Sequence, residues 1–220
     1  MDVALAGDGA AARGIEGVIK EHGAFEQLVV GVNQPGPPPL VAPRDPVLTE
    51  LLHAMTLNND THLDHAGAAV GDPTEVALYE AARDAGLPAA ELLERLPRVA
   101  ELPFDAVRQC MTTLHRPRPE GDILIAYVKG SPEKVLSLCV DVYHPEGPAP
   151  LDREAALALA QGMAAEGLRV LAFARRTFQT PPPIESEHVE TGLSFLGLAG
   201  LLDPPRAEAD AAIADCVSAG

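Results

Sequence analysis

A lysine and a glycine follow an alternating apolar run near the middle of the chain, and together they could bind an anion. The run occupies residues 122–128, and Lys129, Gly130, Ser131 and Pro132 come directly after it. Lysine supplies a mobile cation, and a glycine without a Cβ lets a ligand approach the backbone. Backbone amides at the start of the next helix would point toward the same anion. The pattern is suited to a phosphate or a nucleotide, although a lysine at a strand end is also often a solvated charge.

Glu75 is a second candidate, because a carboxylate can accept hydrogen bonds from a ligand. It ends the segment Gly71-Asp72-Pro73-Thr74-Glu75. In that segment Asp72 is suited to cap a helix, and Pro73 fits the first helical turn. Glu75 then stands where a capping-box glutamate reaches back to the start of the helix. The sequence therefore allows either a capping role or a binding role for Glu75.

Phe104 could supply an aromatic face for a ligand. It follows Pro103 and precedes Asp105, which is more typical of a strand end than of a core centre. A core position remains the alternative on sequence alone. Downstream, residues 108–115 alternate in polarity and predict a strand, with Gln109 and Met111 on the same face.

Metal chemistry and covalent catalysis find little support in the sequence. His62 and His65 lack further residues at ligand spacing, so we expect loop histidines and no metal site. The three cysteines are widely spaced and form no CxxC pair, which is typical of reduced thiols in the cytosol. No catalytic residue is predicted.

Periodicity and turn residues predict alternating helices and strands. Apolar residues at helical spacing and suitable caps predict helices near residues 46–55, 73–82, 89–96, 152–166 and 205–217. Short apolar runs bounded by turn residues predict strands near residues 15–19, 28–32, 108–115, 122–128, 168–174 and 194–202. The segment 184–191 reads as an acidic loop.

Composition limits the partners that the chain can have. The 220 residues carry a formal charge of −16, which argues against nucleic acid and anionic membranes as partners. No apolar run approaches the roughly 18 residues of a membrane span. We expect a soluble monomer without direct membrane contact, and any bound anion needs a locally basic site.

Five segments occur in the order in which they are found in P-type cation-transporting ATPases. They are Gly71-Asp72-Pro73-Thr74-Glu75, Leu102-Pro103-Phe104, Lys129-Gly130-Ser131-Pro132-Glu133, Gly167-Leu168-Arg169-Val170-Leu171 and Asp203-Pro204-Pro205-Arg206. Together they resemble the nucleotide-binding domain of the calcium-pump-like branch, and Leu57-Asn58-Asn59-Asp60 is similar to its Cys-Asn-Asp segment. The resemblance implies an α+β fold with an antiparallel sheet flanked by helices. It also implies a nucleotide-binding domain over residues 1–203, followed by a returning phosphorylation-domain helix over residues 204–220.

The resemblance assigns base-binding roles to four positions. Phe104 would stack on adenine, and Glu75 would lie near the exocyclic amine of the base. Lys129 and Gly130 would form the floor of the pocket.

Four further positions bear on the rest of the nucleotide. Arg169 would lie toward the phosphates, Leu171 would line the pocket, and Met111 and Gln109 would lie beside it. Gln109 stands where a phosphate-side lysine is usual, and Ala106 stands where an arginine is found. Both departures remove positive charge from the phosphate side of the pocket and leave the adenine contacts unchanged.

As a function, the resemblance implies ATP binding within a larger cation pump. The domain would be cytoplasmic, would bind ATP (Mg-ATP in the complete pump), and would present it to phosphorylation and actuator domains. The Asp-Lys-Thr-Gly-Thr motif that carries the phosphorylated aspartate does not occur in the chain, so we expect no phosphoryl transfer by the chain alone. The alternative is an interaction or regulatory module with a degraded nucleotide pocket. A free-standing phosphatase or kinase lacks a nucleophile motif.

Overall fold

The computed structural model describes residues 18–22, 25–31, 45–118 and 122–202. The predicted helix after Pro205, and with it the proposed segment 204–220, lies outside these residues. The helices are α1 (Pro46–Leu57), α2 (Pro73–Asp84), α3 (Ala89–Arg95), α4 (Pro132–Leu138), α5 (Arg153–Ala165) and α6 (Ser186–Val189). The strands are β1 (Val18–His22), β2 (Phe25–Gly31), β3 (His62–Leu63), β4 (Ala69–Val70), β5 (Arg98–Asp105), β6 (Cys110–His115), β7 (Leu124–Gly130), β8 (Cys139–Val142), β9 (Ala149–Pro150), β10 (Arg169–Phe178) and β11 (Leu193–Leu202).

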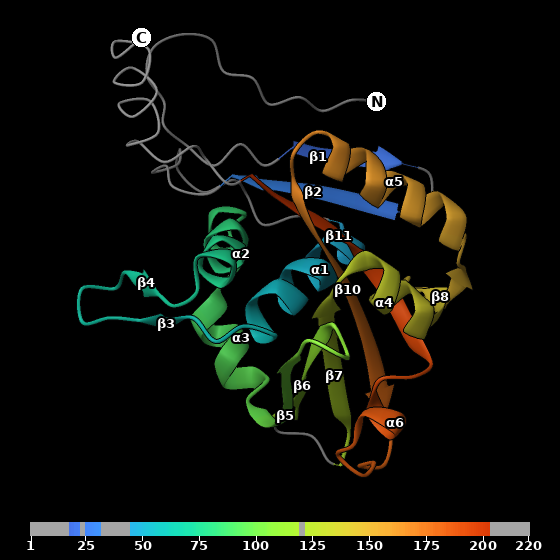
Figure 1. The fold of residues 1–220 in the computed structure, drawn as a ribbon. Coiled ribbons are helices and arrows are strands. Elements are labelled where there is room, and N and C mark those ends of the chain that lie inside the picture. The colour runs from blue at the N-terminus through green and yellow to red at the C-terminus, as the bar shows by residue number, and fades with distance from the viewer. Residues whose placement is uncertain (1–17, 23–24, 32–44, 119–121, 203–220) are drawn as a thin grey trace, which may run out of the picture.

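One large sheet organises the molecule, in the order β1-β2-β11-β10-β7-β6-β5 (Figure 1). Its pairings from β11 through β10, β7 and β6 to β5 are antiparallel. Strand β11 also pairs in parallel with β2 and with β8. The predicted α+β class is confirmed, and the sheet is mixed because β11 has these two parallel neighbours. A separate hairpin of β3 and β4 projects from the body (Figure 1).

Four helices begin where their capping residues predict. Asp45 Oδ1 accepts from Val47 N at 2.7 Å, and Asp72 Oδ1 accepts from Thr74 N at 2.9 Å. Ser131 and Asp152 cap α4 and α5 in the same way. Each cap satisfies an amide that has no partner inside its helix.

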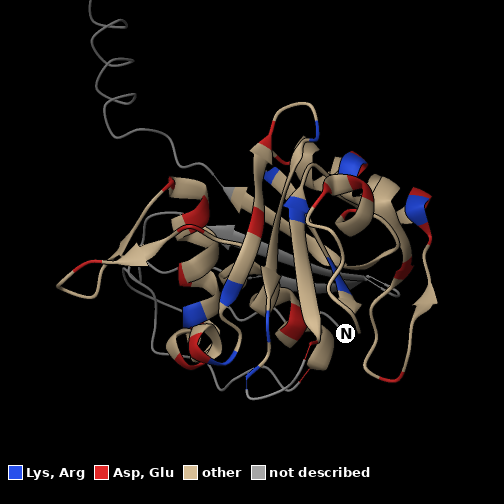
Figure 2. Ribbon diagram, turned by 90° about the horizontal axis from the view of Figure 1, so that it is seen from below, with Lys and Arg blue, Asp and Glu red and all other residues tan. Residues whose placement is uncertain are grey.

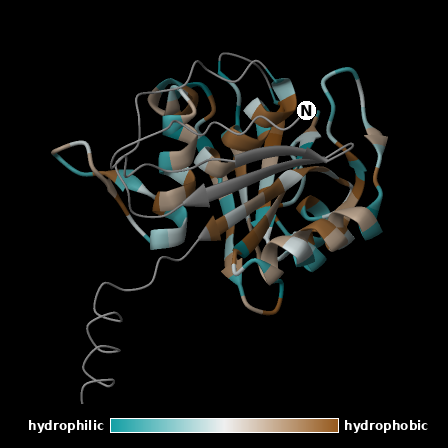
Figure 3. Ribbon diagram, turned by 90° about the horizontal axis from the view of Figure 1, so that it is seen from above, coloured by the Kyte–Doolittle hydropathy of each residue, from teal (hydrophilic) through white to brown (hydrophobic). Residues whose placement is uncertain are grey.

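Helices cover both faces of the sheet and bury its alternating side chains. On one face α1, α2 and α3 pack against Tyr127 and Phe173. On the other face α4 and α5 pack against Val128 and Phe195. The predicted two-sided burial of β7 is therefore confirmed, since consecutive residues Tyr127 and Val128 belong to different core clusters. In Figure 3 the strands that lie between the helices are accordingly coloured largely brown, which marks hydrophobic residues.

Two local predictions are wrong in detail. Strand β6 begins at Cys110, whereas Gln109 lies in the preceding turn with a φ of 55°. The alternation that placed Gln109 and Met111 on one strand face therefore does not extend to Gln109, because a left-handed residue interrupts the pleat. The segment 184–191, predicted as a loop, contains the short helix α6.

Candidate functional site

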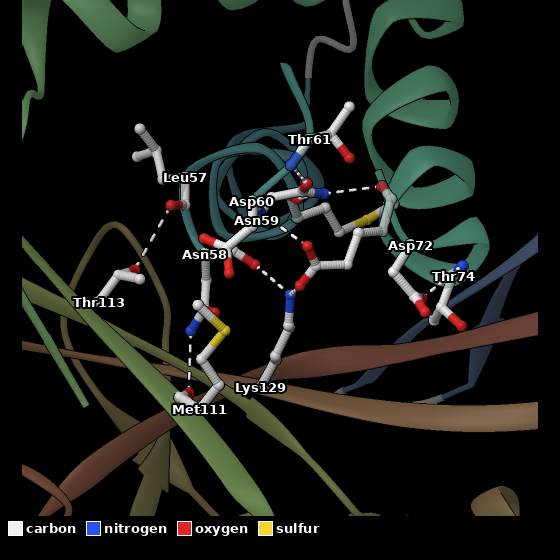
Figure 4. A network of polar contacts seen from close by, with 12 residues as sticks. Leu57, Asn58, Asn59, Asp60, Thr61, Asp72, Thr74, Met111, Thr113 and Lys129 are labelled. Atoms are coloured by element: carbon white, nitrogen blue, oxygen red, sulfur yellow. Dashed lines mark hydrogen bonds and ion pairs between the residues drawn. The ribbon is translucent and has the colours of Figure 1, made fainter. Parts of the chain in front are cut away.

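Lys129 is buried and paired rather than mobile. Its residue is 8% exposed, and its Nζ donates to the Asn58 carbonyl oxygen at 2.6 Å and to Glu75 Oε1. Figure 4 shows Lys129 extending from the sheet to the turn that follows α1. Burial lowers the pKa of Lys129, and the hydrogen bond and charge of Glu75 oppose that shift. The interpretation of Lys129 as a mobile cation is therefore wrong, because two acceptors already hold its ammonium.

Glu75 takes part in this cluster and does not reach back to cap its helix. Its Oε1 accepts from Lys129, and its Oε2 accepts from the Asp60 amide at 2.8 Å. Helix α2 is capped by Asp72 instead. Both oxygens of Glu75 thus face donors from other elements, which corrects the capping-box interpretation of this residue.

The turn after α1 is the part of the cluster that sequence reasoning did not select as a site. Asn58 Nδ2 donates to the carbonyls of Met111 at 3.0 Å and Tyr127 at 2.7 Å, which joins α1 to β6 and β7. Asn59 Nδ2 donates to the carbonyls of Met55 at 3.0 Å and Glu75 at 2.8 Å. The sequence did contain a signal for this turn, namely two consecutive asparagines directly after an apolar helical stripe. Buried side-chain amides must find hydrogen-bond partners, so such a pair indicates contacts with other elements.

Arg98, at the start of β5, fixes the same turn from outside. Its Nη1 contacts Asp60 Oδ1 at 2.6 Å and Glu101 Oε2 at 2.7 Å. Its Nη2 donates to the Asn59 carbonyl at 2.5 Å. A guanidinium presents several donors in one plane, so a single side chain can hold both the backbone and the carboxylate of the turn.

Three of the predicted residues lie close to this cluster. Met111 is buried and directly opposite Lys129 in the β6–β7 pairing, so the two share a face of the sheet. Leu171 is half-buried and packs against the core beneath α1. Arg169 is exposed, and its Nη1 donates to Thr74 Oγ1 at 3.0 Å, one residue before Glu75. The arginine therefore reaches solvent, as its place at the start of β10 permits.

Gly130 is required by the packing of the chain itself. A Cβ at this position would clash with the Gln109 carbonyl oxygen and lie 2.8 Å from Cys110 Cβ. The same carbonyl accepts from Ser131 N at 3.1 Å. The space that was expected to admit a ligand is therefore filled by the turn before β6, which corrects the first interpretation of Gly130.

Phe104 is 65% exposed at the end of β5, so it is not a core aromatic. The turn that follows it is well ordered by hydrogen bonds. Asp105 Oδ1 accepts from the amides of Val107 at 2.9 Å and Arg108 at 2.8 Å. Asp105 pairs with Cys110, and Cys110 pairs with Gly130, so Phe104 and Lys129 lie at the same end of three neighbouring strands.

The charges of this region are mixed, and Figure 2 shows basic and acidic residues scattered over the helices and strands. Within the residues that the structure describes, no group of three or more His, Cys, Asp or Glu side chains could hold a metal ion. None of the helices in that part of the chain has the length and hydropathy needed to cross a bilayer.

The fold defines the chain as an α+β domain with a helix-covered mixed sheet, and comparison with known proteins identifies its family. Residues 47–208 match the family model for the P-type ATPase cytoplasmic domain N. The chain therefore belongs to this family, as the five sequence segments indicated.

Relatives in the curated collections agree with this assignment. The chain is 44% identical over 180 residues to a cation-transporting ATPase of Synechocystis sp., an alignment that covers 80% of this chain and 19% of the relative. It is 34% identical over 173 residues to calcium-transporting ATPase 1 of Bacillus cereus, with 77% of this chain and 19% of the relative covered. The chain thus spans about a fifth of the length of these relatives. The expected family and its cytoplasmic domain are confirmed.

Proposed function

We propose that this domain binds ATP through the adenine base and presents it to a phosphorylation domain outside this chain. The observation that supports the proposal is the exposure of Phe104. This aromatic residue lies in strand β5, and 65% of its surface is exposed. Such a side chain offers a face on which a base can stack. Membership of the domain N family supports the same reading.

The remaining contacts follow from the positions around Phe104. Glu75 would accept from the exocyclic amine, and Leu171 would lie beside the base. Lys129, Met111 and Gly130 are buried, so we propose that they form the floor beneath it, with the open side of Gly130 filled by the Gln109 carbonyl. Arg169 is exposed and contacts Thr74, the residue before Glu75, so it is suited to bind a phosphate. Gln109 is exposed and offers only a neutral hydrogen bond.

Chemistry beyond binding would depend on the rest of a pump. In a complete cation-transporting ATPase the nucleotide would be Mg-ATP, and the phosphorylation and actuator domains would be the partners. Residues 1–203 would form the nucleotide-binding domain, and residues 204–220 would begin the return into the phosphorylation domain. The phosphorylated aspartate would come from that second domain.

Binding by the isolated domain should be weak. One base stack is worth about 1 to 3 kcal/mol, and one charge-assisted hydrogen bond is worth about 1.5 to 3 kcal/mol. Association costs at least about 4 kcal/mol. These two contacts exceed the association cost by at most about 2 kcal/mol, so we expect a dissociation constant for ATP no tighter than the millimolar range.

The test is titration of the domain with ATP, followed by chemical-shift changes, for wild type and for Phe104→Ala. The variant should lose most of the binding while its melting temperature barely changes, because Phe104 is not part of the core. Phe195→Ala is the matched control. Phe195 is fully buried, so its truncation should destabilise the fold by about 3 to 5 kcal/mol. Unchanged ATP binding by a folded Phe104→Ala variant would refute the proposal.

A second candidate is an interaction or regulatory module that no longer binds nucleotide. It is favoured by the internal pairing of Lys129 and by the neutral residues Ala106 and Gln109. The same titration decides between the two, since this module would show no shift changes with millimolar ATP.

A further inference from the structure

Phe104 lies where strand β5 leaves its regular pairing with β6. The register of the two strands shifts between Leu102 and Asp105, so that Pro103 and Phe104 stand against a single residue of β6. Two residues against one is the arrangement of a β-bulge, which bends a strand and turns its side chains in a new direction. Proline has no amide hydrogen and cannot donate to β6. The backbone that presents Phe104 therefore needs an anchor other than the regular ladder.

The side chain of Arg108 supplies such an anchor from the far side of the turn. Its Nη2 donates to the carbonyl oxygen of Pro103. This oxygen belongs to the planar peptide group that joins Pro103 to Phe104, so fixing it also restricts the direction in which Phe104 projects. The amide of Arg108 donates to Asp105 Oδ1 at 2.8 Å, which closes the same turn through the backbone.

Glu190, directly after α6, holds the guanidinium of Arg108 in place. Arg108 Nη1 contacts Glu190 Oε1, and Thr112 Oγ1 on β6 donates to the same oxygen at 2.6 Å. Glu190 is 4% exposed and Thr112 is fully buried. An ion pair with so little solvent around its carboxylate is screened much less than a surface pair. The guanidinium is thus fixed at one end by the body of the domain and reaches the bulge with the other.

We propose that Arg108 is a positioning residue for nucleotide binding, which holds the bulge of β5 on Glu190 so that Phe104 is presented to the base in one orientation. This inference rests on the proposed function. Arg108 would act through the backbone of Phe104 and would not touch the nucleotide, since Glu190 and the Pro103 carbonyl engage its guanidinium. A stacking side chain that is ordered before the ligand arrives avoids part of the entropic cost of binding.

The first test measures the order of the bulge without any nucleotide. The chain contains no Trp, so Phe104→Trp introduces a single indole whose anisotropy decay reports on this position. Arg108→Lys is then added, because it keeps the positive charge beside Glu190 but replaces a fork of donors by one ammonium that cannot hold both partners. The slowly decaying part of the anisotropy should fall by about a third, as expected when a rigid backbone becomes a mobile loop.

The second test compares ATP binding with Phe104 retained. Arg108→Lys should weaken binding about two- to tenfold in a chemical-shift titration, because the ligand must then order the turn itself. Arg153→Lys is the matched control. Arg153 also donates to two carbonyls, those of Leu136 at 3.2 Å and Cys139, but at the end of α4. The control should leave both the anisotropy and the ATP affinity unchanged.

Thermal melts establish that each variant is folded. If Arg108→Lys fails to fold, Arg108→Met combined with Glu190→Gln takes its place, because the double change leaves no buried charge without its partner. A folded variant that keeps either the wild-type anisotropy or the wild-type ATP affinity overturns this inference alone. Failure of wild type to bind ATP overturns the proposed function, and the inference with it.

Discussion

The sequence suggested that a ligand could approach the backbone at Gly130. In the structure the missing Cβ instead allows another part of the chain to pack closely against this residue. The turn before β6 lies against it, with the Gln109 carbonyl bonded to Ser131 N at 3.1 Å. Gln109 adopts a φ of 55°, which non-glycine residues rarely do. The left-handed turn and the missing Cβ therefore belong to one close contact between strands β6 and β7.

Because of this contact, we expect that adding a single methyl group at Gly130 lowers the stability of the domain strongly. Gly130→Ala should destabilise the domain by about 2 to 3 kcal/mol, because the new Cβ meets backbone that cannot move without separating the strands. Gly162→Ala is the control, since a Cβ there meets nothing within 4 Å and lies in helix α5. That change should stabilise the domain by about 0.5 to 1 kcal/mol. Urea unfolding of both variants measures the difference, and equal stability of the two would contradict the packing argument.

Strand β6 is tied to its neighbours by a buried histidine. His115 Nδ1 lies 2.9 Å from the Leu96 carbonyl, just after α3, and its Nε2 lies 2.9 Å from Thr113 Oγ1. These partners suit a neutral ring that donates through Nδ1 and accepts through Nε2. Burial lowers the pKa of His115 to about 4, from an ordinary 6.5.

The lowered pKa predicts a pH dependence of stability. Between about pH 6.5 and 4 the unfolded chain binds a proton at His115 that the folded protein does not, so stability falls as the pH is lowered through this window. The loss should approach about 3 kcal/mol from this residue. His115→Gln, which cannot titrate, should show a flatter profile in urea unfolding at pH 7 and pH 4.5. Parallel profiles for the two proteins would rule out His115 as the cause.

At the level of elements, the turn after α1 connects three parts of the molecule. Asn58 reaches β6 and β7, Asn59 reaches α2, and Arg98 brings β5 to the same turn. Each of these bonds satisfies a buried polar group, so loss of one leaves its partner without a donor or acceptor. The candidate site is thus assembled by contacts between residues about 15 to 70 positions apart.

The molecule as a whole covers about a fifth of the length of the ATPases that it resembles. Its sequence contains no Asp-Lys-Thr-Gly-Thr motif. On the proposed function, a nucleotide-binding domain without a phosphorylated aspartate would contribute positioning, and the transfer step would need another domain.

This division of labour can be tested with the chain alone. Incubation with labelled ATP and magnesium should yield no hydrolysis and no acid-stable, hydroxylamine-sensitive phosphoenzyme. The measurement is acid precipitation with and without hydroxylamine, and a complete relative serves as the positive control. Labelling of this chain under those conditions would show that it carries its own acceptor carboxylate.

The sequence by itself determined the fold class, the starts of four helices and the family. Caps at Asp45, Asp72, Ser131 and Asp152 act within one turn, so local chemistry sufficed to predict them. Alternation in residues 122–128 likewise predicted a strand covered on both faces, and the motif order indicated domain N.

Only the tertiary structure decided what the individual site residues contact. Glu75 could cap its helix or bind elsewhere. The outcome depended on Asp60 and Lys129, which the fold brings to it from the turn after α1 and from β7. The sequence could not distinguish a solvated Lys129 from a buried one, because burial depends on the turn at Asn58 packing over the sheet. Pairing partners far apart in sequence are set by strand order and helix packing, which no local pattern specifies.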